Sequence, residues 1–204
     1  MRRRMMMGGS AKPYDAEVEY LESTGTQWID TGVIPDFNFG ISIDFVALSS
    51  NSRLFGTSFR NKGIWGGVTI SNYTYYDGGQ MTWLNNEKAY NPAIAQYDNQ
   101  RIFITAISNG NCVNYITDKG YRIVLPLVTT SSVHGSFYLY TFNTESLVIN
   151  ASMRIYSCEL YSRNNRVRDF IPVRVGNVGY MYDRVSGQLF GNAGTGQFII
   201  GPDK

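Results

Sequence analysis

The sequence predicts an all-β protein, folded as an antiparallel two-sheet sandwich, and three observations lead to this fold class. Aromatic residues make up 14% of the 204 residues, and aromatic side chains favour strands over helices. The 21 glycines suit the many tight turns that short strands require. Short segments of alternating apolar and polar residues recur, with turn residues roughly every 8–12 positions, which is typical of sandwiches and barrels.

The first strands are expected soon after residue 14. The segment EVEYLE alternates, with Val18 and Tyr20 on one face and Glu17 and Glu19 on the other. We read it as one continuous strand with a solvated acidic face.

The next strong signal is FGISIDFVAL, which begins at residue 39. It places Phe39, Ile41, Ile43 and Phe45 on one face, as expected for a half-buried strand. QWIDTGVI is a strand candidate before this segment. The candidates after it are SRLFGTSF, GIWGGVTISNYTYY, RIFITAI, CVNYIT, YRIVLPL and GSFYLYTF.

Two hairpins are predicted from turn chemistry. Residues 108–111 read Ser-Asn-Gly-Asn between RIFITAI and CVNYIT, and residues 118–120 read Asp-Lys-Gly before YRIVLPL. Asn and Gly accept the positive φ angles of tight hairpin turns. The one helix candidate is NPAIAQY at residues 91–97, which is long enough for a turn or two.

The closing part of the chain contains a long strand, SMRIYSCELY. Simple alternation puts Ile155, Ser157 and Glu159 on one face and the intervening Tyr156, Cys158 and Leu160 on the other. Further on, Pro172 is expected at the edge or the end of a strand, because proline has no N–H to donate. The glycines of FGNAGTGQF are turn-makers; no helix follows them, so they do not form a phosphate loop.

The two ends of the chain resemble a known group of proteins. EYLESTGTQWIDTGVIP near the start and MRIYSCELYSRNNRVRDFIPVRVGNVGYMYDRVSGQLFGNAGTGQF near the end are similar to segments of gut-bacterial and bacteriophage proteins. That group has the concanavalin A-like, laminin G-like jelly roll and includes virion-associated, lectin-like domains. The resemblance implies a jelly roll over residues 14–204 whose first and last strands lie in the same or facing sheets. Fold alone does not imply a ligand.

Residues 1–13 differ in character from the rest. They hold four basic residues and no acid, so this segment carries +4 and residues 14–204 carry −2 of the net +2. The body is therefore not a basic nucleic-acid binder. We expect a flexible arm that docks on other virion or self subunits; its contact residues are Arg2, Arg3, Arg4, Met5, Met6 and Met7.

The arm does not have the features of a signal peptide or lipid anchor. Its apolar part is three methionines followed by glycine, whereas a signal needs an apolar stretch of about 7–15 residues. No apolar run approaches the ~20 residues of a membrane span. We expect a protein of the virion, or alternatively of the bacterial cytoplasm or of the cell surface by a route without a signal peptide.

Catalytic and metal signals are weak. Glu17 and Glu19 would lie about 6.5–7 Å apart along a strand, but the glycanases of this fold use a Glu-x-Asp-x-Glu-type strand, and Leu21 occupies the third position here. His134 is the only histidine, and Cys112 and Cys158 lack zinc-site spacing. One bridge between the two cysteines stays open, but two free buried thiols are preferred. No metal or cofactor is predicted, although the scattered Asp30, Asp36, Asp77 and Asp98 leave calcium open.

A carbohydrate-binding surface is the main alternative. Trp65, Tyr75 and Trp83 lie among amide and acidic residues, a combination that stacks on sugar rings and takes their hydroxyls. The same aromatics could instead fill the core or a subunit interface. The sequence thus favours a non-enzymatic structural or accessory component of a phage particle, with a lectin-like module second and a glycanase third.

Overall fold

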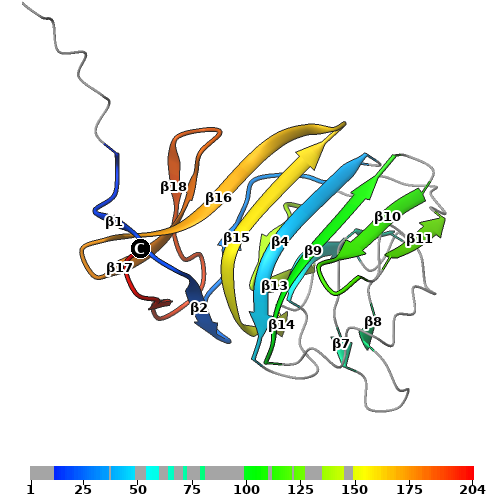
Figure 1. The fold of residues 1–204 in the computed structure, drawn as a ribbon. Coiled ribbons are helices and arrows are strands. Elements are labelled where there is room, and N and C mark those ends of the chain that lie inside the picture. Colours follow the sequence, from blue (N-terminus) through cyan, green and yellow to red (C-terminus); the bar gives the residue numbers. More distant parts are fainter. Residues whose placement is uncertain are drawn as a thin grey trace, which may run out of the picture.

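The computed structural model has one large sheet and one smaller sheet packed face to face (Figure 1). The residues that it describes are 12–36, 38–48, 54–59, 64–66, 71–72, 79–80, 99–109, 112–120, 122–126, 135–144 and 149–204. No helix occurs in these ranges. The expected all-β sandwich is confirmed, and the helix candidate at residues 91–97 lies outside the described residues.

The large sheet has eleven strands, eight of which form its main path. In spatial order these are β11 (Arg122–Pro126), β10 (Cys112–Thr117), β9 (Arg101–Ser108), β4 (Phe39–Ala47), β15 (Ser152–Ser162), β16 (Asn165–Val175), β17 (Val178–Asp183) and β18 (Gln188–Phe190). The three short strands β1 (Ala16–Glu17), β2 (Leu21–Thr24) and β19 (Ile199–Ile200) join it near β15 and β16. All its pairs are antiparallel, and the two predicted hairpins are present as β9–β10 and β10–β11.

The second sheet has six strands. They are β14 (Ile149–Asn150), β13 (Thr141–Thr144), β5 (Phe55–Phe59), β12 (Tyr138–Leu139), β3 (Ile29–Asp30) and β6 (Ile64–Gly66), which pairs with β5. β13 and β5 run parallel, one departure from the expected antiparallel pattern. A separate pair is formed by β7 (Ser71–Asn72) and β8 (Gly79–Gln80).

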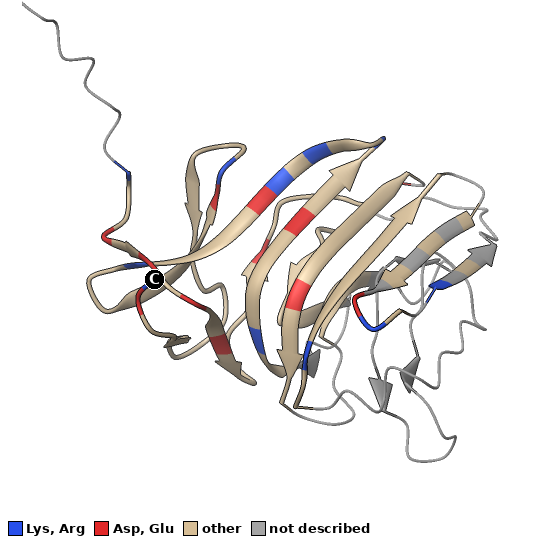
Figure 2. Ribbon diagram, viewed as in Figure 1, with Lys and Arg blue, Asp and Glu red and all other residues tan. Residues whose placement is uncertain are grey.

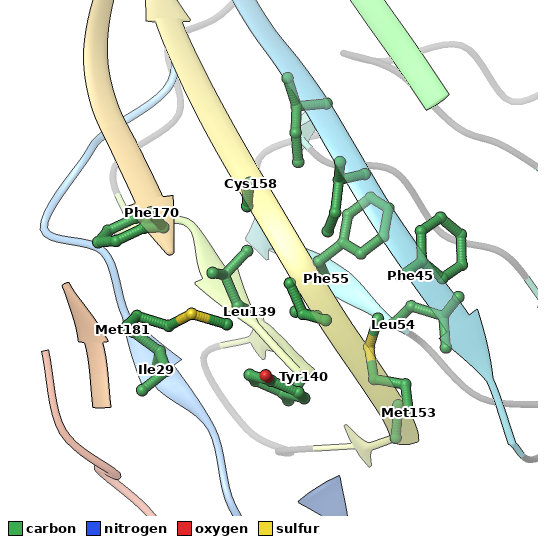
Figure 3. Packing of buried hydrophobic residues seen from close by; sticks show 14 of the residues in the cluster. Ile29, Phe45, Leu54, Phe55, Leu139, Tyr140, Met153, Cys158, Phe170 and Met181 are labelled. Carbon is green, nitrogen blue, oxygen red and sulfur yellow. The ribbon is translucent and has the colours of Figure 1, made fainter. Parts of the chain in front are cut away.

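The core lies between the two sheets (Figure 3). The face predicted for β4 is confirmed, because its odd-numbered residues from 39 to 47 are buried there. Aromatic contacts cross between the layers: the Phe45 ring of β4 meets the Phe55 ring of β5 edge-on, with centroids 5.7 Å apart. Such pairs stabilise by about 0.5–1.5 kcal/mol beyond their buried area.

The opening and closing segments meet in one sheet, as expected. Ile199 and Ile200 pair with Glu22 and Leu21, and Val18 bridges to Asp203. The Asn192 side-chain oxygen accepts the backbone N–H of Trp28 at 3.0 Å and so fixes the 191–197 loop against the start of β3.

The predicted strand over 17–22 is wrong as one continuous element. β1 pairs with β16, whereas β2 pairs with β15 and β19. The chain changes neighbours at Glu19 and Tyr20, so the alternation does not run through this segment.

The prediction that Pro172 lies at the edge or the end of a strand is also wrong. It lies in the interior of β16, opposite Met181 of β17. On the other side of β16, the described ladder with β15 ends at Phe170 and that with β1 begins at Val173. Pro172, which has no N–H, therefore lies where the neighbour of β16 changes from β15 to β1. The sequence pattern does not indicate this change of neighbouring strand.

Candidate functional site

The candidate site is the outer face of the large sheet, which points away from the core. Two rows of side chains cross its central strands. One row runs through Thr105 of β9, Ser42 of β4, Glu159 of β15 and Asp169 of β16; the next contains Phe103, Asp44 and Ser157. The Ser42 and Thr105 hydroxyls lie 3.1 Å apart, within hydrogen-bonding distance.

Acidic residues on this face are paired with arginine. Figure 2 marks the acidic and basic positions along β4, β15 and β16. Arg101 binds both carboxylate oxygens of Asp44, each at 2.8 Å. On β15, Arg154 Nε lies 2.5 Å from Glu22 Oε2. A bidentate contact such as that between Arg101 and Asp44 fixes the geometry of the pair and is stronger than a single hydrogen bond.

A second group of ion pairs links β15, β16 and the turn after β17. Arg166 Nη1 lies 2.8 Å from Glu159 Oε1 and 3.1 Å from Asp169 Oδ2. Arg184 Nη2 contacts the other Asp169 oxygen at 2.7 Å. Two carboxylates and two guanidinium groups thus form a network with no net charge.

Tyr161 completes this network. Its hydroxyl donates to Glu159 Oε2 at 2.5 Å. Burial, followed by this hydrogen bond to a carboxylate, raises the pKa of Tyr161 to about 12. The tyrosine therefore stays protonated at neutral pH and acts as a donor.

A β-bulge shapes the other end of the face. Ile155 pairs with Phe45 and Ser157 with Asp44, which leaves Tyr156 as an extra residue. The predicted alternation of β15 is wrong here: Ile155, Cys158 and Leu160 all enter the core, whereas Tyr156, Ser157 and Glu159 do not. A bulge re-aims side chains in this way because two residues oppose one on the partner strand.

The extra tyrosine takes part in a stack of rings and guanidinium groups. The Arg101 guanidinium lies 3.7 Å from the Tyr156 ring centroid, and that of Arg154 lies 4.6 Å from the Tyr20 centroid. The two tyrosine rings meet edge-on at 5.5 Å. Each ring thus has a cation over it, an arrangement that stabilises the face at the bulge.

Of the three residues predicted for sugar binding, only Trp65 falls within the described residues. Trp65 is in β6 of the second sheet, opposite Ser58, and Tyr75 and Trp83 lie outside the described residues. The arm residues Arg2, Arg3, Arg4, Met5, Met6 and Met7 lie outside them too.

The described end of the arm contacts its own chain. Lys12 Nζ lies 2.9 Å from Glu17 Oε1, and this contact lowers the pKa of Glu17. The docking of residues 1–13 on another chain stays a prediction, because residues 1–11 lie outside the described residues.

Metal and thiol candidates give no site within the described ranges. No three His, Cys, Asp or Glu side chains gather there closely enough to hold a metal ion. Asp30 and Asp36 accept hydrogen bonds from Gly32 and Asn38 instead. Both cysteines are free, and full burial raises the pKa of the Cys158 thiol well above its ordinary value.

The outer-face residues were missed at the sequence level. Ser42 and Asp44 alternate with core residues of β4, so the pattern does indicate that they face away from the core. Their partners come from β9 and β15, which are distant in the chain. Only the strand order brings them together.

Comparison with known proteins finds no family model that matches the chain and no curated protein with significant sequence similarity. In the described part of the chain, no helix has both the length and the apolar character that crossing a bilayer demands.

Proposed function

We propose that this protein is a non-enzymatic structural or accessory component of a bacteriophage particle, a capsid decoration or a fibre-associated module, with a concanavalin A-like, laminin G-like jelly roll. The assignment to a particle rests on the resemblance of the two end motifs. One structural observation supports a non-enzymatic role: Asp44, Glu159 and Asp169 on the outer face all hold arginine partners.

Glycoside hydrolysis needs a different arrangement. One carboxylic acid must carry a proton for the leaving group, while a second carboxylate acts as nucleophile or base. Arginine nitrogens lie 2.7–2.8 Å from the carboxylates of Asp44, Glu159 and Asp169, so these contacts already occupy oxygens that a hydrolase would turn toward its substrate. Incubation with a panel of polysaccharides should release no reducing ends; release that Glu159→Gln abolishes would overturn the non-enzymatic proposal.

Assembly through the arm is the positive test. Deleting residues 2–11 retains Lys12, whose contact with Glu17 belongs to the sandwich. We expect the truncated protein to keep its thermal midpoint but to lose incorporation into particles. A matched variant with Arg2, Arg3 and Arg4 changed to Gln tests the charge alone. Equal incorporation of truncated and full-length protein would contradict the proposal.

A lectin-like module is the second candidate, and Phe103 favours it. Its side chain is 41% exposed on the outer face. Phe103 is opposite Asp44 on one neighbouring strand and next to Asp118 on the other side. The Asp118 carboxylate accepts the Phe103 N–H at 3.2 Å. Arg101 already binds both oxygens of Asp44, so a sugar that stacks on the Phe103 ring would donate its hydroxyls to Asp118 instead.

Surface glycans would then be the partner, with no role for membrane or specific nucleic acid. Glycan-array hits that Phe103→Ala removes would support this second candidate. Hits that depend on Trp65, Tyr75 or Trp83 instead would place the site in the other aromatic segment. No hits at all would favour the structural role.

A further inference from the structure

The outer face of the large sheet carries an apolar cluster of its own on the β16–β17 hairpin. Ile171 and Val173 of β16 are 7% and 0% exposed, although they do not belong to the core between the sheets. Their partners in β17 are Tyr182 and Tyr180. Because Met181 between these tyrosines enters the core, both tyrosine side chains lie on the outer face, together with Ile171 and Val173.

Residues 12–18, the arm root, connect the arm to this hairpin. β1 pairs with β16, and the Val18 N–H donates to the Pro172 carbonyl oxygen at 3.0 Å. Just before β1, the centroid of the Tyr14 ring lies 5.0 Å from that of the Tyr182 ring. Figure 1 shows β1 beside β16 and β17, at the end of the large sheet opposite β9–β11. The arm therefore leaves the fold at this cluster.

Valines and half-buried tyrosines form the exposed part of this surface. Val175 and Val178 are opposite each other where the hairpin ends, and they are 37% and 39% exposed. The Tyr180 ring lies against Gly191, where a Cβ would be 3.2 Å from it. Tyrosine is enriched in protein interfaces, because a ring held in place adds contact area at a small cost in entropy.

Two ion pairs border the surface. Lys12 Nζ lies 2.9 Å from Glu17 Oε1, and Arg174 binds both carboxylate oxygens of Asp203 at 2.6 and 2.7 Å. These pairs add no net charge. The three arginines of the arm, by contrast, have no acidic residue near them in the sequence of residues 1–13. A partner that receives them must supply acidic side chains.

We propose that the outer face of this hairpin is the apolar half of the interface that the arm begins. The protein that receives the arginines in an acidic groove also buries Val175 and Val178 and contacts Tyr180 and Tyr182. This inference rests on the proposed docking of the arm, and it defines the partner as a protein with an apolar patch bordered by acidic side chains.

One partner subunit can reach both halves. Arg4 is ten residues before Tyr14, a distance of at most about 35 Å along an extended chain. An interface of standard size buries about 800 Å² on each side, which corresponds to a patch roughly 30 Å across. The arm and the hairpin therefore fit a single interface.

Binding of the full chain to purified phage particles prepared without this protein tests the inference. Val178→Asp should weaken binding about tenfold or more, because it removes an apolar contact and places an acid against acidic side chains. Val178→Lys should weaken binding less, since a lysine there is attracted to the same acids. Val124→Asp is the matched control and should leave binding unchanged, because Val124 is 56% exposed on the same face at the other end of the sheet.

The outcomes separate this inference from the proposed function. Thermal midpoints show whether each variant folds, and Val175→Asp takes the place of a Val178→Asp variant that does not. If deletion of residues 2–11 abolishes binding while Val178→Asp binds as well as Val124→Asp, the hairpin is no part of the interface and the inference is wrong. Equal losses for Val178→Asp and Val178→Lys would refute the acidic border. A wild-type chain that does not bind the particles would contradict the proposed function, and this inference with it.

Discussion

The closing half of the large sheet, β15–β18, and its other end, β9–β11, are held together by different interactions. In the closing half, a buried polar side chain holds a turn and a strand in place, because Asp183 accepts three backbone N–H groups at 2.8–3.2 Å. The β9–β11 end consists of two hairpins with exposed apolar side chains. Buried hydrogen bonds hold the first region, whereas the second exposes Phe103, Ile116 and Val124 to solvent.

The largest difference in unfolding free energy between the two regions is expected for one aspartate from each, Asp183 and Asp118. Asp183 is fully buried, and its carboxylate also accepts the Ser186 hydroxyl at 2.6 Å. Asp183→Ala should lower the free energy of unfolding by roughly 2–4 kcal/mol, because the buried Asp169 N–H and three partly buried donors lose their acceptor. Asp118, exposed in the β10–β11 turn, is the control. Asp118→Ala should cost less than about 1 kcal/mol. Similar urea midpoints for the two variants would refute the distinction.

Two glycines sharpen the comparison further. A Cβ at Gly194 would overlap the Thr26 carbonyl oxygen and the Trp28 ring, whereas Gly120 has φ +84° and open space around it. Gly194→Ala should cost about 2–3 kcal/mol through overpacking. Gly120→Ala should cost about 1 kcal/mol through the left-handed backbone alone. Thermal midpoints measure both, and an equal loss would mean that the 191–197 loop yields more easily than its contacts indicate.

Sequence reasoning succeeded where local pattern and tertiary neighbours agree. The face of β4 and both hairpins followed from alternation and from Asn and Gly in the turns. It failed at Tyr156 and Pro172, because a bulge and a change of strand neighbour are set by pairing between distant segments. The outer face was missed for the same reason, since β9, β4 and β15 are adjacent in space but not in sequence.

The neutral network of the closing half should also respond to alkaline pH. Tyr161 has a pKa of about 12 in the folded state, above the ordinary value of about 10. The unfolded chain therefore loses this proton first, so stability is complete below pH 10 and falls between pH 10 and 12. The loss attributable to Tyr161 should reach at most about 2 kcal/mol.

Urea unfolding at pH 9 and pH 11 measures this difference. Tyr161→Phe should show a smaller decrease than wild type over the same interval, because phenylalanine does not ionise. An identical decrease in both proteins would show that the ionisation of Tyr161 does not cause the loss of stability at alkaline pH.

The smallest effect is expected at the ion pair that joins the two regions. Arg101 of β9 contacts Asp44 of β4 in bidentate fashion and covers Tyr156 of β15. Its side chain is 56% exposed, so solvent screens the charge. Arg101→Lys keeps the charge but loses the planar fork and its stacking, which should cost about 0.5–1 kcal/mol. Arg122→Lys on the edge strand β11 is the matched control, with an expected change near zero. Because Arg101→Lys keeps the charge, a cost that comes from lost stacking should be the same in 1 M NaCl, whereas a cost that comes from a weaker ion pair with Asp44 should be screened. A difference that vanishes in salt would assign the contribution of Arg101 to Asp44 alone, and one that persists would assign it to the tyrosine that the bulge presents.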